Sequence, residues 1–138
     1  MVLIHAGYFS HELGMCMQSD VLLPQSEGPH RVLWLLHGAS DDETAWQRRT
    51  SIERYVEGTG LAVVMPCGHL SSYVNMAHGG KYFSYIADEL PAIMRGFFSL
   101  SDKREDNFIA GLSMGGMGAL KIAMRRPEQY EAVCCLSA

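Results

Sequence analysis

The residues Gly111-Leu-Ser-Met-Gly115 match the pattern G-x-S-x-G, which is typical of an abrupt strand-to-helix turn with a nucleophilic serine at its tip. Glycine at both ends leaves room for the close backbone packing that such a turn needs. Ser113 is therefore a candidate nucleophile, and its chemistry would be the uptake of an acyl group from an ester. A chain of this composition matches the pattern by chance about once in ten. The flanking sequence must therefore support the interpretation.

The residues on both sides of Ser113 predict the strand and the helix that such a turn joins. An apolar run over 107–112 indicates a strand, and a run rich in Met and Ala over 114–126 indicates a helix. The first amides of that helix would face the oxyanion of a tetrahedral intermediate, with Met114 as one donor. The alternative is a glycine-rich turn in which Ser113 only caps the helix.

A second oxyanion donor is predicted in His37-Gly38-Ala39, which directly follows another apolar run over 31–36. We assign this donor to the Ala39 amide, and each of the two donors would lower the barrier by about 3 kcal/mol. His37 stands at a strand end and precedes the nucleophile in the chain. A positioning role is therefore favoured over the role of general base.

The order of elements along the chain predicts an α/β protein with a mostly parallel sheet and helices on both faces. Short apolar runs predict six strands, over residues 2–9, 15–23, 31–36, 61–65, 107–112 and 132–136. The first two look antiparallel. One or two short helices are expected between Thr44 and Gly58, with Asp41 and Asp42 as N-caps. An amphipathic helix is expected over 82–98, kinked or broken at Pro91, and the whole chain, 1–138, forms a single domain.

Composition excludes several classes of partner. The 138 residues carry a net charge of -4 with the basic side chains scattered, so nucleic acid is not expected as a partner. No apolar stretch reaches the ~18 residues of a membrane span, and no signal peptide is visible. We therefore expect a cytoplasmic protein that does not associate with membranes.

The four cysteines, at 16, 67, 134 and 135, include no C-x-x-C pair, which favours a reducing compartment. Cys134 and Cys135 lie in an apolar run and are interpreted as small core residues. Cys67-Gly68-His69 offers only two soft ligands. No metal site is therefore predicted.

With these motifs in hand, the chain resembles the α/β-hydrolase esterases that include S-formylglutathione hydrolases and bacterial tributyrin-type carboxylesterases. Residues 108–116 look like that family's nucleophile segment, and Leu35-Leu-His-Gly38 looks like its oxyanion strand. Further similar residues are Trp46 with Arg48, Val64-Met-Pro66 and Glu89-Leu-Pro91. The resemblance implies a serine esterase that transfers a short acyl group from an ester or thioester to Ser113 and then to water, without a cofactor.

The resemblance also exposes a gap. In this fold the triad acid and histidine lie on loops after two further strands, and no residue before Ala138 matches either position. The other histidines, His5, His11, His30, His69 and His78, all precede Ser113. We therefore expect this chain to be the N-terminal part of a longer enzyme that lacks the last two strands, with the triad Asp and His beyond Ala138.

Two other functions fit the same residues. A catalytically silent hydrolase-like module could bind a ligand, or assemble into a homo-oligomer through the apolar strand 132–136. An acyltransferase of the same fold would pass the acyl group to an alcohol instead of water. Trp46 and Tyr73 are weak candidates for the wall of a substrate pocket, although Tyr73 could equally lie on the surface.

Overall fold

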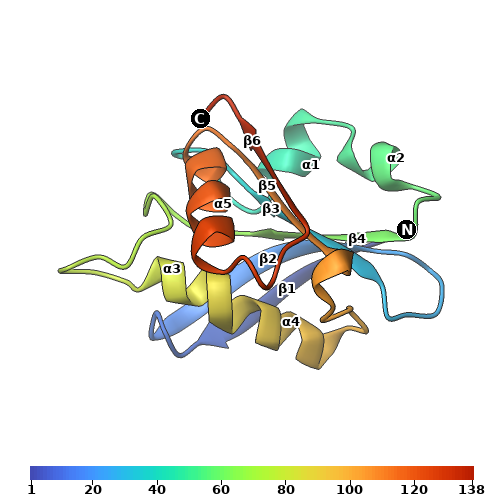
Figure 1. Ribbon diagram of the computed structural model, residues 1–138, viewed down its shortest axis with the longest axis horizontal. Helices are drawn as coiled ribbons and strands as arrows, with labels where there is room; N and C mark the ends of the chain where they lie inside the picture. The colour runs from blue at the N-terminus through green and yellow to red at the C-terminus, as the bar shows by residue number, and fades with distance from the viewer.

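A computed structural model describes all residues, 1–138, and places the six predicted strands in one sheet with the order β1-β2-β4-β3-β5-β6 (Figure 1). The strands are β1 (Val2–Ser10), β2 (Met15–Leu23), β3 (Arg31–Leu36), β4 (Leu61–Pro66), β5 (Asn107–Leu112) and β6 (Ala132–Leu136). β2 pairs antiparallel with β1 and with β4, whereas β4, β3, β5 and β6 run parallel. The predicted α/β class is confirmed.

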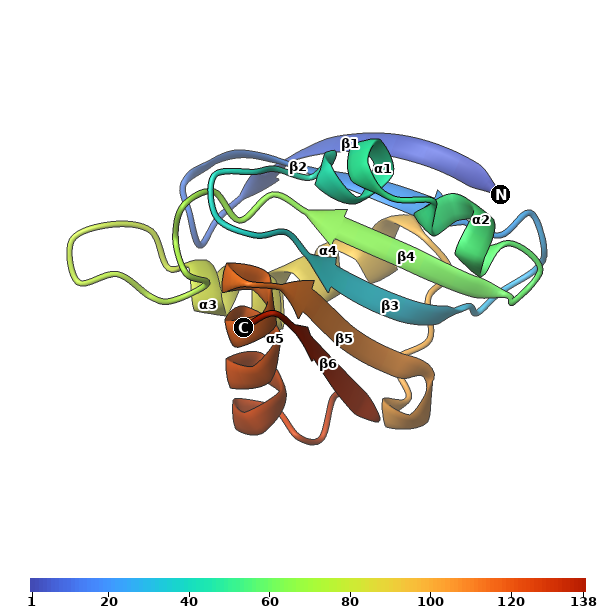
Figure 2. The same cartoon turned by 90° about the horizontal axis from the view of Figure 1, so that it is seen from above.

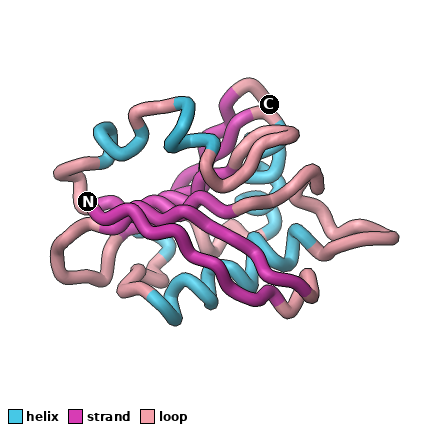
Figure 3. Tube along the Cα trace, turned by 180° about the vertical axis from the view of Figure 1, so that it is seen from behind, coloured by secondary structure: helices cyan, strands magenta, loops and turns pink.

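Position within the sheet explains the sequence pattern of each strand. β3 and β4 lie in the middle of the sheet and are buried along most of their length. Strands that are covered on both faces need apolar side chains in succession, which is why both read as continuous apolar runs. β1 lies at one edge, and buried residues alternate with exposed ones in its second half. The hairpin of β1 and β2 forms the long pair of strands in the view from behind (Figure 3).

Helices cover both faces of the sheet (Figure 2). The short helices α1 (Ala45–Arg49) and α2 (Ile52–Val56) pack on one face, where Ile52 and Val56 join a buried cluster of seven residues. On the other face lie α3 (Tyr82–Ser84), η1 (Tyr85–Glu89), α4 (Leu90–Phe97) and α5 (Met114–Arg125). A 3-10 turn, η2 (Arg104–Asp106), leads into β5.

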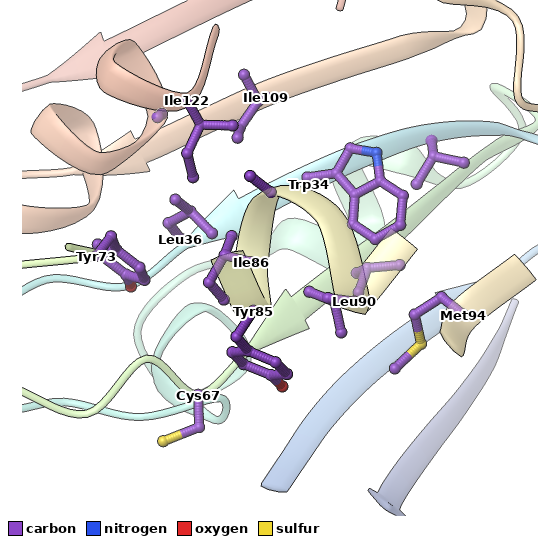
Figure 4. Packing of buried hydrophobic residues seen from close by; sticks show 14 of the residues in the cluster. Trp34, Leu36, Cys67, Tyr73, Tyr85, Ile86, Leu90, Met94, Ile109 and Ile122 are labelled. Carbon is purple, nitrogen blue, oxygen red and sulfur yellow. The ribbon is translucent and has the colours of Figure 1, made fainter. Parts of the chain in front are cut away.

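The larger core lies between the sheet and the second group of helices and contains 22 buried residues. Figure 4 shows Ile109 of β5 beside Ile122 of α5, and Trp34 of β3 above Leu90 of α4. Burying one such large apolar side chain contributes about 1.5–3 kcal/mol relative to leaving it exposed. This core fixes α5 against β5 and so fixes the turn that joins them.

The predicted helix over 82–98 is continuous from Tyr82 to Phe97 but changes its winding before Pro91. Residues 85–89 form a π-helical turn, in which the Leu90 amide donates to Tyr85 O five residues back. Proline has no amide hydrogen, and its ring collides with the carbonyl four residues earlier in an ordinary helix. The wider turn accommodates Pro91 without ending the helix.

Glu89, the last residue of the π turn, holds the β1–β2 turn in place. Its carboxylate accepts hydrogen bonds from Ser10 Oγ at 2.5 Å and from the amides of His11 and Glu12 at 2.8 and 3.2 Å. The helix end and the hairpin turn are therefore tied together by one side chain.

Replacing Glu89 by alanine removes the acceptor of all three hydrogen bonds at once. We expect Glu89→Ala to lower the free energy of unfolding by about 1–3 kcal/mol, because a partly buried serine hydroxyl and two amides lose their partner. Urea denaturation measures the change. Glu27→Ala, an exposed loop residue, is the matched control, and equal stability of the two variants would contradict the assigned role.

The link between β3 and β4 forms two short helices, as expected, and Gly58 follows the second with a φ of +78°. The predicted N-caps are wrong, however, because the residue that caps α1 is Thr44, without a side-chain cap. Asp42 accepts from the Thr44 amide at 2.9 Å in the turn before the helix. Asp41 instead pairs with Arg48 and Arg49 of α1.

Cys134 and Cys135 are exposed, so their interpretation as core residues is wrong. They lie on β6, an edge strand of the sheet that residues 1–138 form, which pairs with β5 on one side only. Cys67, just after β4, is buried. None of the helices in the chain has the length and apolarity that crossing a membrane requires.

Candidate active site

Ser113 occupies the junction between β5 and α5 in a backbone conformation that is rare for serine, with φ 55° and ψ −113°. Its amide donates to Leu136 O of β6 at 2.7 Å, and its carbonyl accepts from the Met117 amide at 3.0 Å. Residues in such strained conformations persist only where the surroundings enforce them, and they cluster at functional sites. The residue itself is exposed. The hydroxyl therefore stands at the carboxyl end of a central strand, open to a ligand.

The two glycines of the motif are required by close backbone contacts. A Cβ placed on Gly115 would collide with Leu36 O and lie 2.6 Å from His37 O. A Cβ on Gly111 would strike the Gly115 backbone in the same turn. Only glycine lets the start of α5 approach the end of β3 this closely, which brings Ser113 next to the loop that follows β3.

The loop after β3 is fixed by His37, which is buried. The Gly68 amide donates to His37 Nε2 at 2.8 Å, so the ring proton lies on Nδ1 and is donated to Gly38 O at 2.6 Å. This tautomer is required because an amide can only donate. With both nitrogens engaged, His37 links the loops after β3 and β4. It is not placed to accept a proton from Ser113.

Burial lowers the pKa of the His37 imidazole from its ordinary value of 6.5, because desolvation disfavours the charged ring. The folded protein therefore binds a proton here less readily than the unfolded chain does. It follows that this residue's contribution to stability is complete above pH 6.5 and is lost as the pH falls below that value.

We expect His37→Gln to flatten the stability profile below pH 6.5 relative to the original protein. The test measures the unfolding temperature of both proteins between pH 5 and 8 and follows the difference between them. Taking this difference cancels the contribution of His5 to the pH dependence of stability, which has the opposite sign. A hydrogen bond to Asp20 raises the pKa of His5. His78→Gln, in an exposed loop, is the control, and parallel profiles for His37→Gln and the original protein would contradict the expectation.

Ala39 and Met114 belong to the two segments that adjoin Ser113, the loop after β3 and the start of α5. The Ala39 amide donates to no acceptor within the protein. Met114 is the first residue of α5, where the amide has no partner within the helix. The two loops adjoin, since a Cβ on Gly38 would lie 3.8 Å from Ser113 Cβ. Two amides without a helical or sheet partner thus lie on the segments that meet at Ser113.

Ser113 opens into a cavity of about 240 Å³ at the carboxyl ends of β3 and β5. It is lined by His37, Gly38, Ala39, Asp41, Ala45, Trp46, Arg49, Thr50, Leu112 and Ser113. Ala45, Trp46 and Leu112 supply apolar surface, and Asp41 and Arg49 supply the only charges. A cavity of this size with few polar groups suits a small organic ligand.

The structure brings three of the predicted site residues into this cavity, namely Ser113, Ala39 and Trp46, with Met114 adjacent to Ser113 in the chain. Sequence reasoning missed Asp41 and Arg49 as lining residues. A signal for Arg49 was present, because it follows Trp46 by three residues, and residues three apart share one face of a helix.

Tyr73 does not line the cavity, so its prediction as a pocket wall is wrong, as is the alternative of a surface tyrosine. The side chain is fully buried, and its hydroxyl donates to His37 O at 2.8 Å. A Cβ added to Gly118 would lie 2.5 Å from Cδ2 of the Tyr73 ring. Tyr73 therefore supports the loop after β3 from inside the core, beside Leu36 (Figure 4).

No other histidine reaches the cavity around Ser113. His69 lies in the loop after β4, where its Nδ1 is 2.8 Å from the Tyr82 hydroxyl. No group of three or more His, Cys, Asp or Glu side chains is arranged to hold a metal ion. Ser113 and Ala39 thus line the cavity, Met114 follows Ser113 in the chain, and the 138 residues place no free base beside Ser113.

Comparison with known proteins finds esterases and serine hydrolases. The model of a family named esterase, with the description "putative esterase", matches residues 10–138. An acetyl esterase from Caldicellulosiruptor saccharolyticus is 32% identical over 108 residues, which make up 78% of this chain and 41% of that protein. The chain thus spans less than half the length of this curated relative.

Two solved structures from Staphylococcus aureus are also similar. A fluorophosphonate-binding serine hydrolase with bound substrate is 42% identical with a TM-score of 0.95, over 99% of this chain and 57% of that one. An S-formylglutathione hydrolase without ligand is 41% identical with a TM-score of 0.85, over 96% of this chain and 57% of that one. The chain therefore superposes almost completely on the corresponding part of longer proteins.

Proposed function

The chain belongs to the esterase family, and from that premise we propose that the protein is a serine carboxylesterase that hydrolyses short-chain acyl esters or S-acyl thioesters. The observation that carries this proposal is the position of Ser113. Its hydroxyl lies at a strained strand-to-helix turn and lines a cavity together with Ala39, whose amide has no partner. A nucleophile beside unpaired backbone donors suits acyl transfer.

In the proposed reaction, Ser113 Oγ attacks the carbonyl carbon of the ester while a base removes the hydroxyl proton. The carbonyl oxygen becomes an oxyanion and accepts hydrogen bonds from the Ala39 and Met114 amides. Collapse of the intermediate breaks the bond to the leaving alcohol or thiol, which takes the proton. Water then attacks the acyl-serine, and the same steps release the carboxylic acid.

The general base and its acidic partner come from residues outside these 138. His37 is buried with both ring nitrogens engaged, and no other histidine lines the cavity. A serine without a base is a weak nucleophile. The fluorophosphonate-binding and S-formylglutathione hydrolases that this chain matches are longer proteins, of which it covers 57%.

The names of similar proteins support a short acyl group. The names of the relatives, an acetyl esterase and an S-formylglutathione hydrolase, agree with small acyl groups. The proposed steps use protein side chains, backbone amides and a water molecule, and they involve no cofactor.

We also propose that residues 1–138 belong to one domain, because both buried clusters pack against the same sheet. The cytoplasmic location and the homo-oligomeric state stay predictions from the sequence.

A fluorophosphonate probe tests the nucleophile directly, since it forms a covalent bond with an activated serine. The complete protein is incubated with the probe and digested, and mass spectrometry locates the adduct. We expect the adduct on Ser113, no labelling of Ser113→Ala, and full labelling of the control Ser26→Ala, which changes an exposed loop serine.

Two outcomes would favour the other functions. A folded, complete protein in which Ser113 stays unlabelled and no nitrophenyl ester is hydrolysed would favour a catalytically silent binding module. An acyltransferase would be favoured if the probe labels Ser113, hydrolysis is slow, and an added alcohol accepts the acyl group to form a new ester.

A further inference from the structure

The charges inside the Ser113 cavity come from two residues, Asp41 and Arg49. Asp41 is largely enclosed, and each of its carboxylate oxygens faces a cation. Oδ1 lies 2.5 Å from Arg48 Nη2 and also accepts from the Asp42 amide at 3.0 Å, whereas Oδ2 lies 3.4 Å from Arg49 Nε. The negative charge of Asp41 is therefore already neutralised within the protein.

The two arginines differ in how much of their hydrogen-bonding capacity is used. Arg48 donates through Nε to Thr44 Oγ1 at 2.7 Å and through Nη2 to Asp41. Arg49 meets the protein only through Nε, at the longer distance of 3.4 Å, and its side chain is 70% exposed. The Arg49 guanidinium thus lies near Asp41, and both of its Nη groups have no partner within the protein.

The helix α1 places Arg49 beside the apolar wall of the cavity. Trp46 and Arg49 are three residues apart on this helix and both line the cavity that contains Ser113. A molecule whose ester group reaches Ser113 along the Trp46 surface would therefore meet the Arg49 guanidinium. Guanidinium groups bind carboxylates through paired, charge-assisted hydrogen bonds.

We propose that Arg49 is a specificity-determining residue that binds a carboxylate carried by the ester or thioester substrate. The inference rests on the proposed esterase function and goes beyond it by naming a substrate class, anionic esters, and the residue that selects it. Arg49 contacts a part of the substrate that does not react. Its contribution therefore appears in kcat/KM for anionic substrates, mainly through KM.

Matched pairs of substrates test the proposal with the complete protein. 4-Acetoxybenzoate and its methyl ester differ by a carboxylate on the leaving group. The mono-4-nitrophenyl ester of glutaric acid and 4-nitrophenyl pentanoate differ by a carboxylate on the acyl group. Uncatalysed hydrolysis is subtracted in each case. The pair that shows the preference tells which end of the substrate reaches Arg49.

We expect Arg49→Gln to lower kcat/KM about tenfold for the anionic member of one pair, which is typical of one charge-assisted contact near the surface. The neutral member should change less than twofold. Arg49→Lys should restore part of the preference, and 0.5 M NaCl should weaken it in the original protein, because salt screens exposed charges. Arg54→Gln, on α2 and outside the cavity, is the matched control.

Two results would overturn the proposal. One is an equal loss for anionic and neutral esters, which would mark Arg49 as a structural residue. The other is no loss for any substrate. Failure of the esterase function itself looks different, because the original protein would then hydrolyse none of the four esters.

Discussion

Replacing Ser113 by alanine is expected to lower kcat/KM for 4-nitrophenyl acetate by about 10⁴- to 10⁶-fold, the range seen when a catalytic serine is removed from a complete triad. The reason is chemical, because alanine has no oxygen to form the acyl-enzyme, and only the oxyanion donors and binding contacts remain. Steady-state kinetics on the complete protein measures the loss. The residue is exposed, so the fold should survive.

The stability of the variant separates a chemical from a structural effect. Ser113→Ala keeps a Cβ at the same strained φ of 55°. Its unfolding temperature should therefore stay close to that of the original protein. Ser26→Ala should match the original protein in both activity and stability. Activity of Ser113→Ala within tenfold of the original would rule out Ser113 as the nucleophile.

The second large effect is expected from Gly115→Ala, which tests whether the turn depends on backbone contact. The added methyl group would collide with Leu36 O and lie 2.6 Å from His37 O. Both are main-chain atoms of β3 and its loop, so they cannot move aside as a flexible side chain does. We expect a loss of at least about 3 kcal/mol in the free energy of unfolding, the upper range for overpacking.

Gly115→Ala should also lower kcat/KM by more than the loss of folded protein explains. The backbone shift that relieves the collision would move Ser113 away from the loop that contains Ala39. Gly96→Ala is the matched control. Gly96 lies inside α4, and no atom lies within 4 Å of its added Cβ. Alanine should stabilise the helix there by up to about 1 kcal/mol. Chemical denaturation of both variants checks the contrast, and similar stabilities would show that the turn tolerates a side chain.

Backbone strain gathers at the edge of the sheet where the site lies. Ser40, His69, Ser72 and Tyr73 share the positive φ of Ser113, at values between 50° and 64°. They lie in the loops after β3 and β4, which His37 and Tyr73 connect through hydrogen bonds. Positive φ costs free energy for residues other than glycine. The core beneath these loops supplies the stability that offsets it.

The sequence by itself determined the strands, the helix α5 and the turn at Ser113. Each of these features leaves a recognisable pattern in a short stretch of the sequence. Continuous apolar runs mark β3 and β5 because both faces of a central strand are covered, and glycine at 111 and 115 marks a turn that no larger residue can make. The position of Ala39, directly after the apolar run over 31–36 and His37-Gly38, likewise identified it as a predicted oxyanion donor.

Only the tertiary structure decided what lies around these elements. Tyr73 is buried because the ring fills space left by Gly68, in the same loop, and by Gly118 of α5, which is distant in sequence. Within residues 1–138, Cys134 and Cys135 are exposed because β6 pairs with β5 on one side only. Arg49 lines the cavity because α1 packs near the end of β5. Burial and access depend on what faces a residue across the fold, and local sequence patterns do not encode that partner.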